Sequence, residues 1–121
     1  MNRFLTLFAA LMLSVASYAQ TAVVPGDATT FAAVKKSGTF DYTFNGVSAD
    51  AVKEAAKNYV RFFSVDVRQD KQTVLVKVKL NQNSEQERKV QIRFFKSSGI
   101  TTVSFNGADY SVDDFFAKYM N

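Results

Sequence analysis

Three residue types are missing from this chain of 121 residues: it has no cysteine, no histidine and no tryptophan, and it has a single proline. Without cysteine there is no thiol nucleophile and no disulfide framework. Without cysteine and histidine there is no Ser-His-Asp triad, no Cys/His zinc site and no haem held by either residue. The five glycines stand singly, so no glycine-rich phosphate-binding loop is present either. We therefore expect a protein that is not an enzyme and that holds no cofactor.

The first 19 residues have the three-part pattern of a secretory signal peptide. Arg3 supplies a short basic start, residues 4–15 form an almost unbroken apolar run, and Ser17 and Ala19 are small residues just before a cut at Gln20. The apolar run is too short for a membrane span, which needs roughly 20 residues. We expect an exported protein, periplasmic or extracellular, with no stable membrane insertion. A buried N-terminal helix is the alternative interpretation of the same run.

Removal of residues 1–19 leaves 102 residues, with 14 Lys and Arg against 11 Asp and Glu and so a formal charge of +3. This length suits one domain whose core needs no disulfide. Proteins that bind nucleic acid usually gather their basic residues in a stripe. In this chain the basic residues are scattered among acidic ones, so we expect no nucleic-acid partner.

Residues 20–38 have the composition of a flexible N-terminal arm. They contain the only proline, Pro25, followed by glycine and aspartate and then by alanine and threonine. A short helix over 29–36 fits within this arm and would end at Gly38. The remaining residues, 39–121, are then expected to form a single α+β domain.

Alternating apolar and polar residues predict four strands. They cover residues 39–44, 63–67, 73–80 and 101–105, and the second and third form an antiparallel hairpin around a polar loop. Helical spacing of apolar residues predicts a helix over 49–60, for which Ser48 is a good N-cap.

A last helix is predicted at the end of the chain, capped by Asp109 or Ser111. Its inner face would carry one valine and three aromatic residues: Val112, Phe115, Phe116 and Tyr119. Because this helix is short, it must dock on the rest of the domain to persist.

The segment 84–98 fits two structures. Apolar and polar residues alternate from position 89 to 94, which is typical of a strand. However, Ser84 and Glu87 have the spacing of a capping box at a helix start. Gly99 suits the left-handed residue that ends a helix in a Schellman motif. We favour the helix.

With that helix, the order of elements is strand, helix, strand, strand, helix, strand, which is the order of ferredoxin-like domains. Residues 44–105 resemble the heavy-metal-associated domain of copper chaperones and metal-transporting ATPases. The similar segments are Asn45-Gly46-Val47-Ser48 before the first helix, 64–67 and 73–76 as the middle strands, and the helix end at 95–100. The resemblance implies a ferredoxin-like βαββαβ sandwich, here with an extra C-terminal helix. The alternative fold is an antiparallel β-meander packed on one helix.

The chain departs from that family where the family binds metal. The family holds Cu(I) or a similar soft ion with a Cys-x-x-Cys pair, and those positions fall on Ala49 and Val52. Soft ions require thiolate, thioether or imidazole donors, and after removal of residues 1–19 only Met120 is of this kind. The resemblance therefore implies a fold without a metal site, and metal ion handling is kept as the alternative function.

Acidic residues provide two further candidate sites, one for a hard cation and one for acid–base catalysis. Asp113 and Asp114, with Asp109 nearby, could hold a hard cation, but the spacing lacks a calcium-loop pattern. Compensation of charge at a helix N-terminus explains them better. Two of three other acidic residues could form a carboxylate pair for acid–base catalysis, although nothing in the sequence brings them together. These residues are Asp41, Glu54 and Asp66.

The aromatic content suggests a binding function. Of 12 Phe and 5 Tyr, three lie within residues 1–19, and several of the other 14 form adjacent Phe pairs at 62–63, 94–95 and 115–116. Such a pair is awkward for an element with one buried face, so one ring of each pair would face solvent or the second side of the element. The rings then either form the core together with a docked terminal helix or contribute to an apolar surface patch. We predict a binding or adaptor module that recognises another envelope or extracellular protein, or a second copy of itself. The predicted interaction surface consists of Phe62, Phe94, Phe115, Leu75, Lys77 and Lys79.

Overall fold

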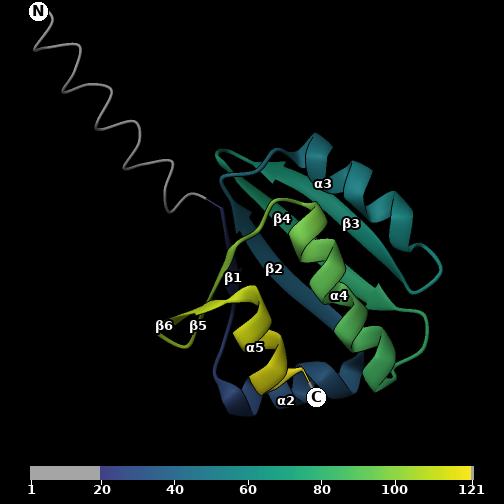
Figure 1. Ribbon diagram of the computed structural model, residues 1–121, viewed down its shortest axis with the longest axis vertical. Coiled ribbons are helices and arrows are strands. Elements are labelled where there is room, and N and C mark those ends of the chain that lie inside the picture. The colour runs from purple at the N-terminus through teal and green to yellow at the C-terminus, as the bar shows by residue number, and fades with distance from the viewer. Residues whose placement is uncertain (1–19, 121) are drawn as a thin grey trace, which may run out of the picture.

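The computed structural model describes residues 20–120, in which six strands form one mixed sheet (Figure 1). The fold is α+β, as the sequence predicted. Along the chain the elements are β1 (Thr21–Val24), α2 (Ala28–Ser37), β2 (Thr39–Asn45), α3 (Ala49–Ala56), the 3-10 turn η1 (Lys57–Tyr59), β3 (Phe63–Asp70), β4 (Thr73–Leu80), α4 (Glu85–Ser97), β5 (Thr102–Phe105), β6 (Ala108–Ser111) and α5 (Val112–Tyr119).

The strands lie in the order β3-β4-β2-β1-β5-β6 across the sheet. Neighbouring strands are antiparallel except β1 and β5, which are parallel. The predicted hairpin is confirmed, since β3 and β4 pair from Phe63↔Leu80 to Asp70↔Thr73. The strands predicted at 39–44 and 101–105 and the helix predicted at 49–60 are also present, with small differences at their ends.

Residues 20–38 differ from the predicted flexible arm. Their first part is β1, which lies inside the sheet between β2 and β5 and buries Ala22 and Val24. The second part is α2, whose first turn is capped by the Asp27 carboxylate, and it matches the short helix that the sequence allowed. A strand of four residues carries too little alternation to be recognised alone. Its pairing with β5, near the other end of the chain, makes it part of the sheet.

The helical interpretation of 84–98 is confirmed by α4. The Ser84 hydroxyl oxygen accepts a hydrogen bond from the Glu87 backbone N–H at 3.2 Å, which is one half of the predicted capping box. The other half differs, because the Glu87 carboxylate accepts from the Gln82 N–H instead of the Ser84 N–H. At the other end, Gly99 has φ of 96° and lies within the two backbone hydrogen bonds of a Schellman motif.

The core lies between the sheet and the helices and is built largely of phenylalanine. Both rings of the pairs Phe94–Phe95 and Phe115–Phe116 are buried, so of the two interpretations of these pairs the core is correct and the surface patch is wrong. Helix α4 contacts both α3 and α5 besides covering the sheet, so more than one side of it is buried. The rings meet edge to face, as in the contact of Phe95 with Phe116 at 5.2 Å between ring centroids.

Strand β6 was not predicted. After β5 the chain turns at Asn106 and Gly107, with φ of 52° and 79°, and returns antiparallel to β5. Two positive φ values in a two-residue loop are typical of a type I′ hairpin turn, for which Asn-Gly is the preferred sequence. The Ser111 hydroxyl then caps α5 by accepting from the Asp114 N–H at 3.1 Å, as one of the two predicted caps. No helix within residues 20–120 is long and apolar enough to cross a membrane.

Candidate functional site

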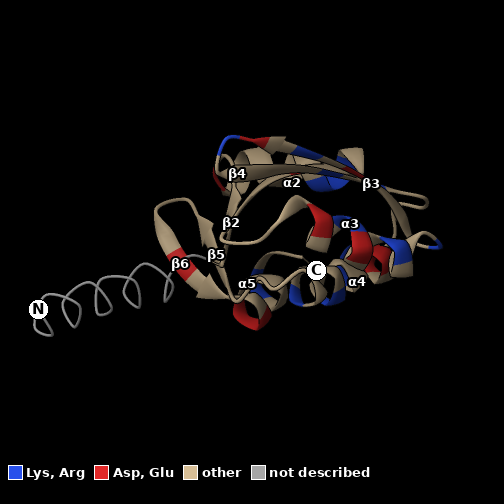
Figure 2. Cartoon of the chain, turned by 90° about the horizontal axis from the view of Figure 1, so that it is seen from above, with Lys and Arg blue, Asp and Glu red and all other residues tan. Residues whose placement is uncertain are grey.

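The helices α3, α4 and α5 lie on one side of the sheet (Figure 2), and α2 packs its Phe31 against Phe40 and Phe115 of the same core. On the opposite face, a shallow depression is lined by strand residues and Pro25, with no residue of a helix among the described ones. The alternation of the strands assigns side chains to each face. In β2, Phe40, Tyr42 and Phe44 are buried towards the helices, whereas Asp41 is exposed and Thr43 half-buried on the other side. We call that other side the open face. It is the candidate functional site.

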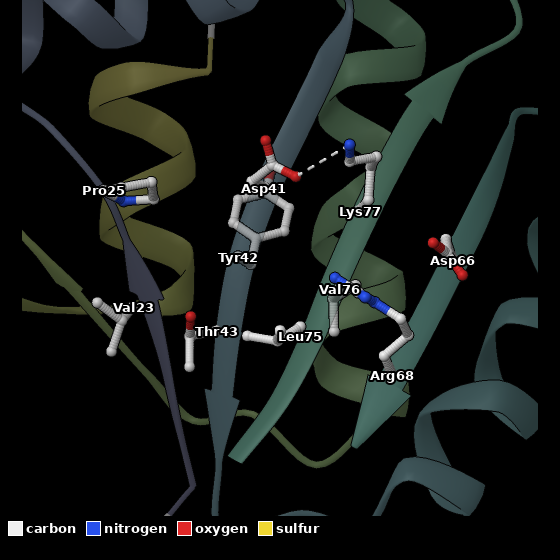
Figure 3. Close-up of a pocket in the computed structure, with 10 residues that line it drawn as sticks. All are labelled: Val23, Pro25, Asp41, Tyr42, Thr43, Asp66, Arg68, Leu75, Val76 and Lys77. Carbon is white, nitrogen blue, oxygen red and sulfur yellow. Dashed lines mark ion pairs between the residues drawn. The ribbon is translucent and has the colours of Figure 1, made fainter. Parts of the chain in front are cut away.

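Strand register places a row of four side chains across the open face, of which Leu75 and Val23 are apolar. Arg68 of β3 lies opposite Leu75 of β4, Leu75 opposite Thr43 of β2, and Thr43 opposite Val23 of β1. Figure 3 shows these side chains in sequence across the four strands. Val23 is 36% exposed and Leu75 is half-buried, so apolar surface remains accessible at the centre of a polar face. We call this set the apolar row.

A charged row runs beside the apolar row. Here Lys77 of β4 lies opposite both Asp66 of β3 and Asp41 of β2. The Lys77 Nζ atom is 3.9 Å from Asp41 Oδ1, and the two side chains are 58% and 66% exposed (Figure 3). An exposed ion pair of this kind contributes little to stability. Its charges are therefore available to a partner at small cost to the fold.

The two rows and Pro25 line a shallow depression of about 270 Å³ that is open to solvent. Small-molecule sites usually enclose roughly 300–1,000 Å³ and bury most of the ligand surface. A smaller, open depression on a sheet accommodates side chains of an extended segment better than it encloses a compact ligand. The geometry of the open face therefore suits a macromolecular partner.

The structure divides the six residues of the predicted interaction surface. Phe94 and Phe115 have no exposed surface, which corrects their assignment to a surface patch. Phe94 packs against the Phe63 ring at 5.8 Å between centroids, inside the core. Phe62 is half-buried at the end of the loop before β3. The other three project from β4 onto the open face: Leu75, Lys77 and Lys79.

Sequence reasoning missed the partners that the other strands bring to these residues. Val23 and Pro25 belong to the stretch expected to be a flexible arm, and Arg68 belongs to a stretch expected to be a loop. The alternation of 63–67 could have been extended to Arg68 and Asp70, because polar residues keep the same spacing there. No local signal could place Val23 beside Thr43.

The candidate catalytic carboxylates do not form a catalytic pair. Asp41 and Asp66 lie in the same row, but Lys77 lies between them in the register and pairs with Asp41. Both are exposed, so neither burial nor contact between like charges distinguishes one as the proton donor. Glu54 lies on α3 in an exposed ion pair with Lys57, at 2.7 Å.

The candidate metal positions do not come together as a set of donors among the described residues. Asp113 pairs with Lys96 at 2.7 Å, and residues 20–120 contain no group of three or more His, Cys, Asp or Glu placed to hold a metal ion. Val52, at one of the two positions that match the cysteines of the heavy-metal-associated family, has no exposed surface. A side chain there points into the core, away from an ion at the surface. The residues present at positions 49 and 52 therefore do not fit a soft metal ion.

The largest electrostatic perturbation lies beneath the sheet. Burial raises the pKa of Tyr42 well above its ordinary value of 10.0, and its hydroxyl donates a hydrogen bond to Gln91 Oε1 at 2.6 Å. At the start of α2, the hydrogen bond from the Thr30 backbone N–H lowers the pKa of Asp27. Both groups are explained by their structural contacts, and neither side chain belongs to the open face.

Comparison with known proteins adds no relatives: no protein-family model, no curated protein and no solved structure matches the chain. The functional interpretation therefore depends on the surface itself.

Proposed function

We propose that this protein is an exported, non-enzymatic binding module that recognises another envelope or extracellular protein through the open face of its sheet. The observation that carries the proposal is the apolar row, in which Leu75 and Val23 remain accessible beside exposed charges of both signs. Protein interfaces have this composition, with an apolar centre and a polar rim. The partner we propose is an extended protein segment that lies across the strands.

The charged row supports a protein partner of mixed charge. The sign of the charge alternates along this row, from Asp66 on β3 to Lys77 on β4 and Asp41 on β2. Beside the row, Arg68 adds a second positive charge on β3. Alternating charges orient a partner and reject wrong ones more than they raise affinity. A partner with a single dominant charge, such as a nucleic acid, would meet repulsion at two of these four positions.

Export is part of the proposal, and the structure is compatible with the cut expected before Gln20. Strand β1 begins at Thr21, so this cut leaves the whole sheet intact. The Gln20 carbonyl oxygen accepts a hydrogen bond from the Thr101 N–H at 3.0 Å, which keeps the new terminus against the domain. Intact-mass measurement of the protein recovered from the cell envelope or medium should give a chain that starts at Gln20. A chain that keeps Met1 would contradict export by this route.

We further propose that β2, α3, β3, β4, α4 and β5 form a ferredoxin-like core with an inserted strand. Its support is the order β3-β4-β2 with antiparallel neighbours and a helix after β2 and after β4. In a ferredoxin-like sheet the last strand lies directly beside the first, whereas here β1 lies between β5 and β2.

Metal handling, the alternative function, has no such support, because positions 49 and 52 carry no donor.

The proposal can be tested by site-specific photo-crosslinking in the producing cells. A photoreactive amino acid at position 75 reports on the open face, and the matched control is Ala33, an exposed position on α2. We expect defined crosslinked products from position 75 and none of these from position 33. Identical products from both positions, or none from position 75, would overturn the assignment of the open face.

A partner identified in this way allows a quantitative test with purified proteins. Leu75→Ser and Lys77→Glu should each weaken binding by about tenfold or more, as expected for residues near the centre of an interface. The matched control is Lys36→Glu, which makes the same charge change at an exposed position on α2. Equal loss of affinity in the control would indicate a general effect of net charge.

A further inference from the structure

Strand β3 forms one edge of the sheet, where α3 packs alongside it but no described strand pairs with its outer side. It pairs with β4 along all of its 8 residues, and no strand of the described chain lies on its other side. The outward N–H and C=O groups of an edge strand are a template for another strand, and proteins usually block them with proline, bulges, short strands, charged side chains or a covering helix. β3 has a continuous register and no proline, and its inward side chains Phe63, Val65 and Val67 are apolar.

The charges of β3 are complementary to themselves about one residue. We propose that two copies of this protein pair through β3, antiparallel, about a twofold axis at Val67. In that register the Asp66 of each copy lies opposite the Arg68 of the other, so two opposite-charge pairs form on the open face. A twofold axis at Asp66 would instead place the two Asp66 carboxylates opposite each other, and an axis at Arg68 would do the same to the two Arg68 side chains. Charge complementarity therefore selects the register centred on Val67.

The opposite side of the β3 edge supplies apolar surface to the same contact. Val60 is 70% exposed, one of the two large hydrophobic residues of the described chain that are exposed. With Ala56, Val65 and Val67 it forms the apolar part of a hollow between α3 and β3, whose polar part is lined by Lys53, Lys57, Ser64 and Asp66. Twofold pairing brings the hollows of the two copies side by side, which removes this apolar surface from water.

The pairing has a geometric consequence for the molecule. A twofold axis perpendicular to the sheet keeps both open faces on the same side, so the two sheets join into one continuous surface. In this register Arg68, at the end of each apolar row, lies opposite Asp66 of the other copy, so the apolar row of one copy continues into the charged row of the other. This inference is independent of the proposed function, since the β3 edge pairs whether or not the open face binds a partner.

The first test uses charge reversal and analytical ultracentrifugation of the protein purified after expression of the full chain. Arg68→Asp and Asp66→Arg each replace two opposite-charge pairs by two like-charge pairs, and each should raise the dimer dissociation constant on the order of 30-fold. The double variant restores opposite charges and should restore the dimer. The matched control is Asp109→Arg, the same change at the other edge of the sheet on β6, which should dimerise like the unmodified protein.

The second test uses the absence of cysteine from the chain. Val67→Cys places the thiol of one copy opposite the same thiol of the other copy, within the distance that a disulfide requires. With diamide as oxidant, it should form a covalent dimer about tenfold faster or more than Ser64→Cys, since Ser64 lies opposite Asp70 in the proposed register. A monomer at all concentrations, a dimer unaffected by both single reversals, or equal crosslinking at the two positions would each overturn the proposal.

Discussion

The buried contact between Tyr42 and Gln91 gives a sharp prediction about stability. The hydroxyl and Gln91 Oε1 are 2.6 Å apart, the residues are 2% and 0% exposed, and Gln91 Nε2 has no hydrogen-bond partner among the described residues. Tyr42→Phe leaves the whole amide of Gln91 buried and unpaired. A buried polar group without its partner costs about 1–3 kcal/mol, so we expect a loss of about 2 kcal/mol.

The partner variant should behave differently. Gln91→Leu leaves the Tyr42 hydroxyl unpaired, but it also removes the orphaned Nε2 and adds apolar surface to the core. We expect a smaller loss, about 1 kcal/mol. Replacing both residues removes every polar atom of the contact, so the double variant Tyr42→Phe/Gln91→Leu should equal or exceed the unmodified protein in stability.

Urea unfolding followed by far-UV circular dichroism measures these differences, since the chain has no tryptophan to report by fluorescence. With a denaturant slope of about 1–2 kcal/mol/M, a loss of about 2 kcal/mol lowers the midpoint by roughly 1–2 M. The matched control is Tyr119→Phe, which alters a half-buried tyrosine near the C-terminus. A double variant less stable than both single variants, or a neutral Tyr42→Phe, would refute the reasoning.

The remaining predictions concern the core, one helix end and pH. Phe94→Ala should cost about 3–5 kcal/mol of stability and Leu75→Ser less than about 1 kcal/mol, measured by urea unfolding; the reverse order would contradict the burial of Phe94. Gly99→Ala should cost about 1–2 kcal/mol, because φ is +96° there and a Cβ would approach Val47 Cγ1 to 3.3 Å; an unchanged melting temperature would contradict this strain. Above pH 10 the unfolded chain loses the Tyr42 proton while the folded chain keeps it. Stability should therefore be full below pH 10 and fall by about 1.4 kcal/mol per pH unit above it, a component that Tyr42→Phe should lack.

Much of the local structure could be predicted from the sequence because its causes lie within a few residues. Ser48, Ser84 and Ser111 cap helices by accepting hydrogen bonds from N–H groups three residues later. The alternation of β2 and β4 assigned their faces correctly, and with it the outward direction of Leu75. The choice between helix and strand at 84–98 followed from its caps, which outweighed a competing alternation.

Only part of the candidate site could be predicted, because local patterns show which residues of one strand share a face but not which strands are neighbours. Three of its residues lie on β4, where the period of two shows which side chains share a face. The aromatic pairs misled the choice of Phe94 and Phe115 as surface residues, because the sequence does not show whether the second ring of a pair meets solvent or another element. Helix α4 contacts α3 and α5 as well as the sheet, so it can bury Phe94 and Phe95 together.

The caps, the strand faces, the α+β class and the residue types available for chemistry all follow from local patterns in the sequence. Tertiary structure decided which strands are neighbours, the burial of the Phe pairs and the exposure of the β3 edge. The reason is the range of the interactions. Caps and alternation depend on neighbours along the chain, whereas β1 becomes a strand only between β2 and β5, and the open face exists only once four strands lie side by side.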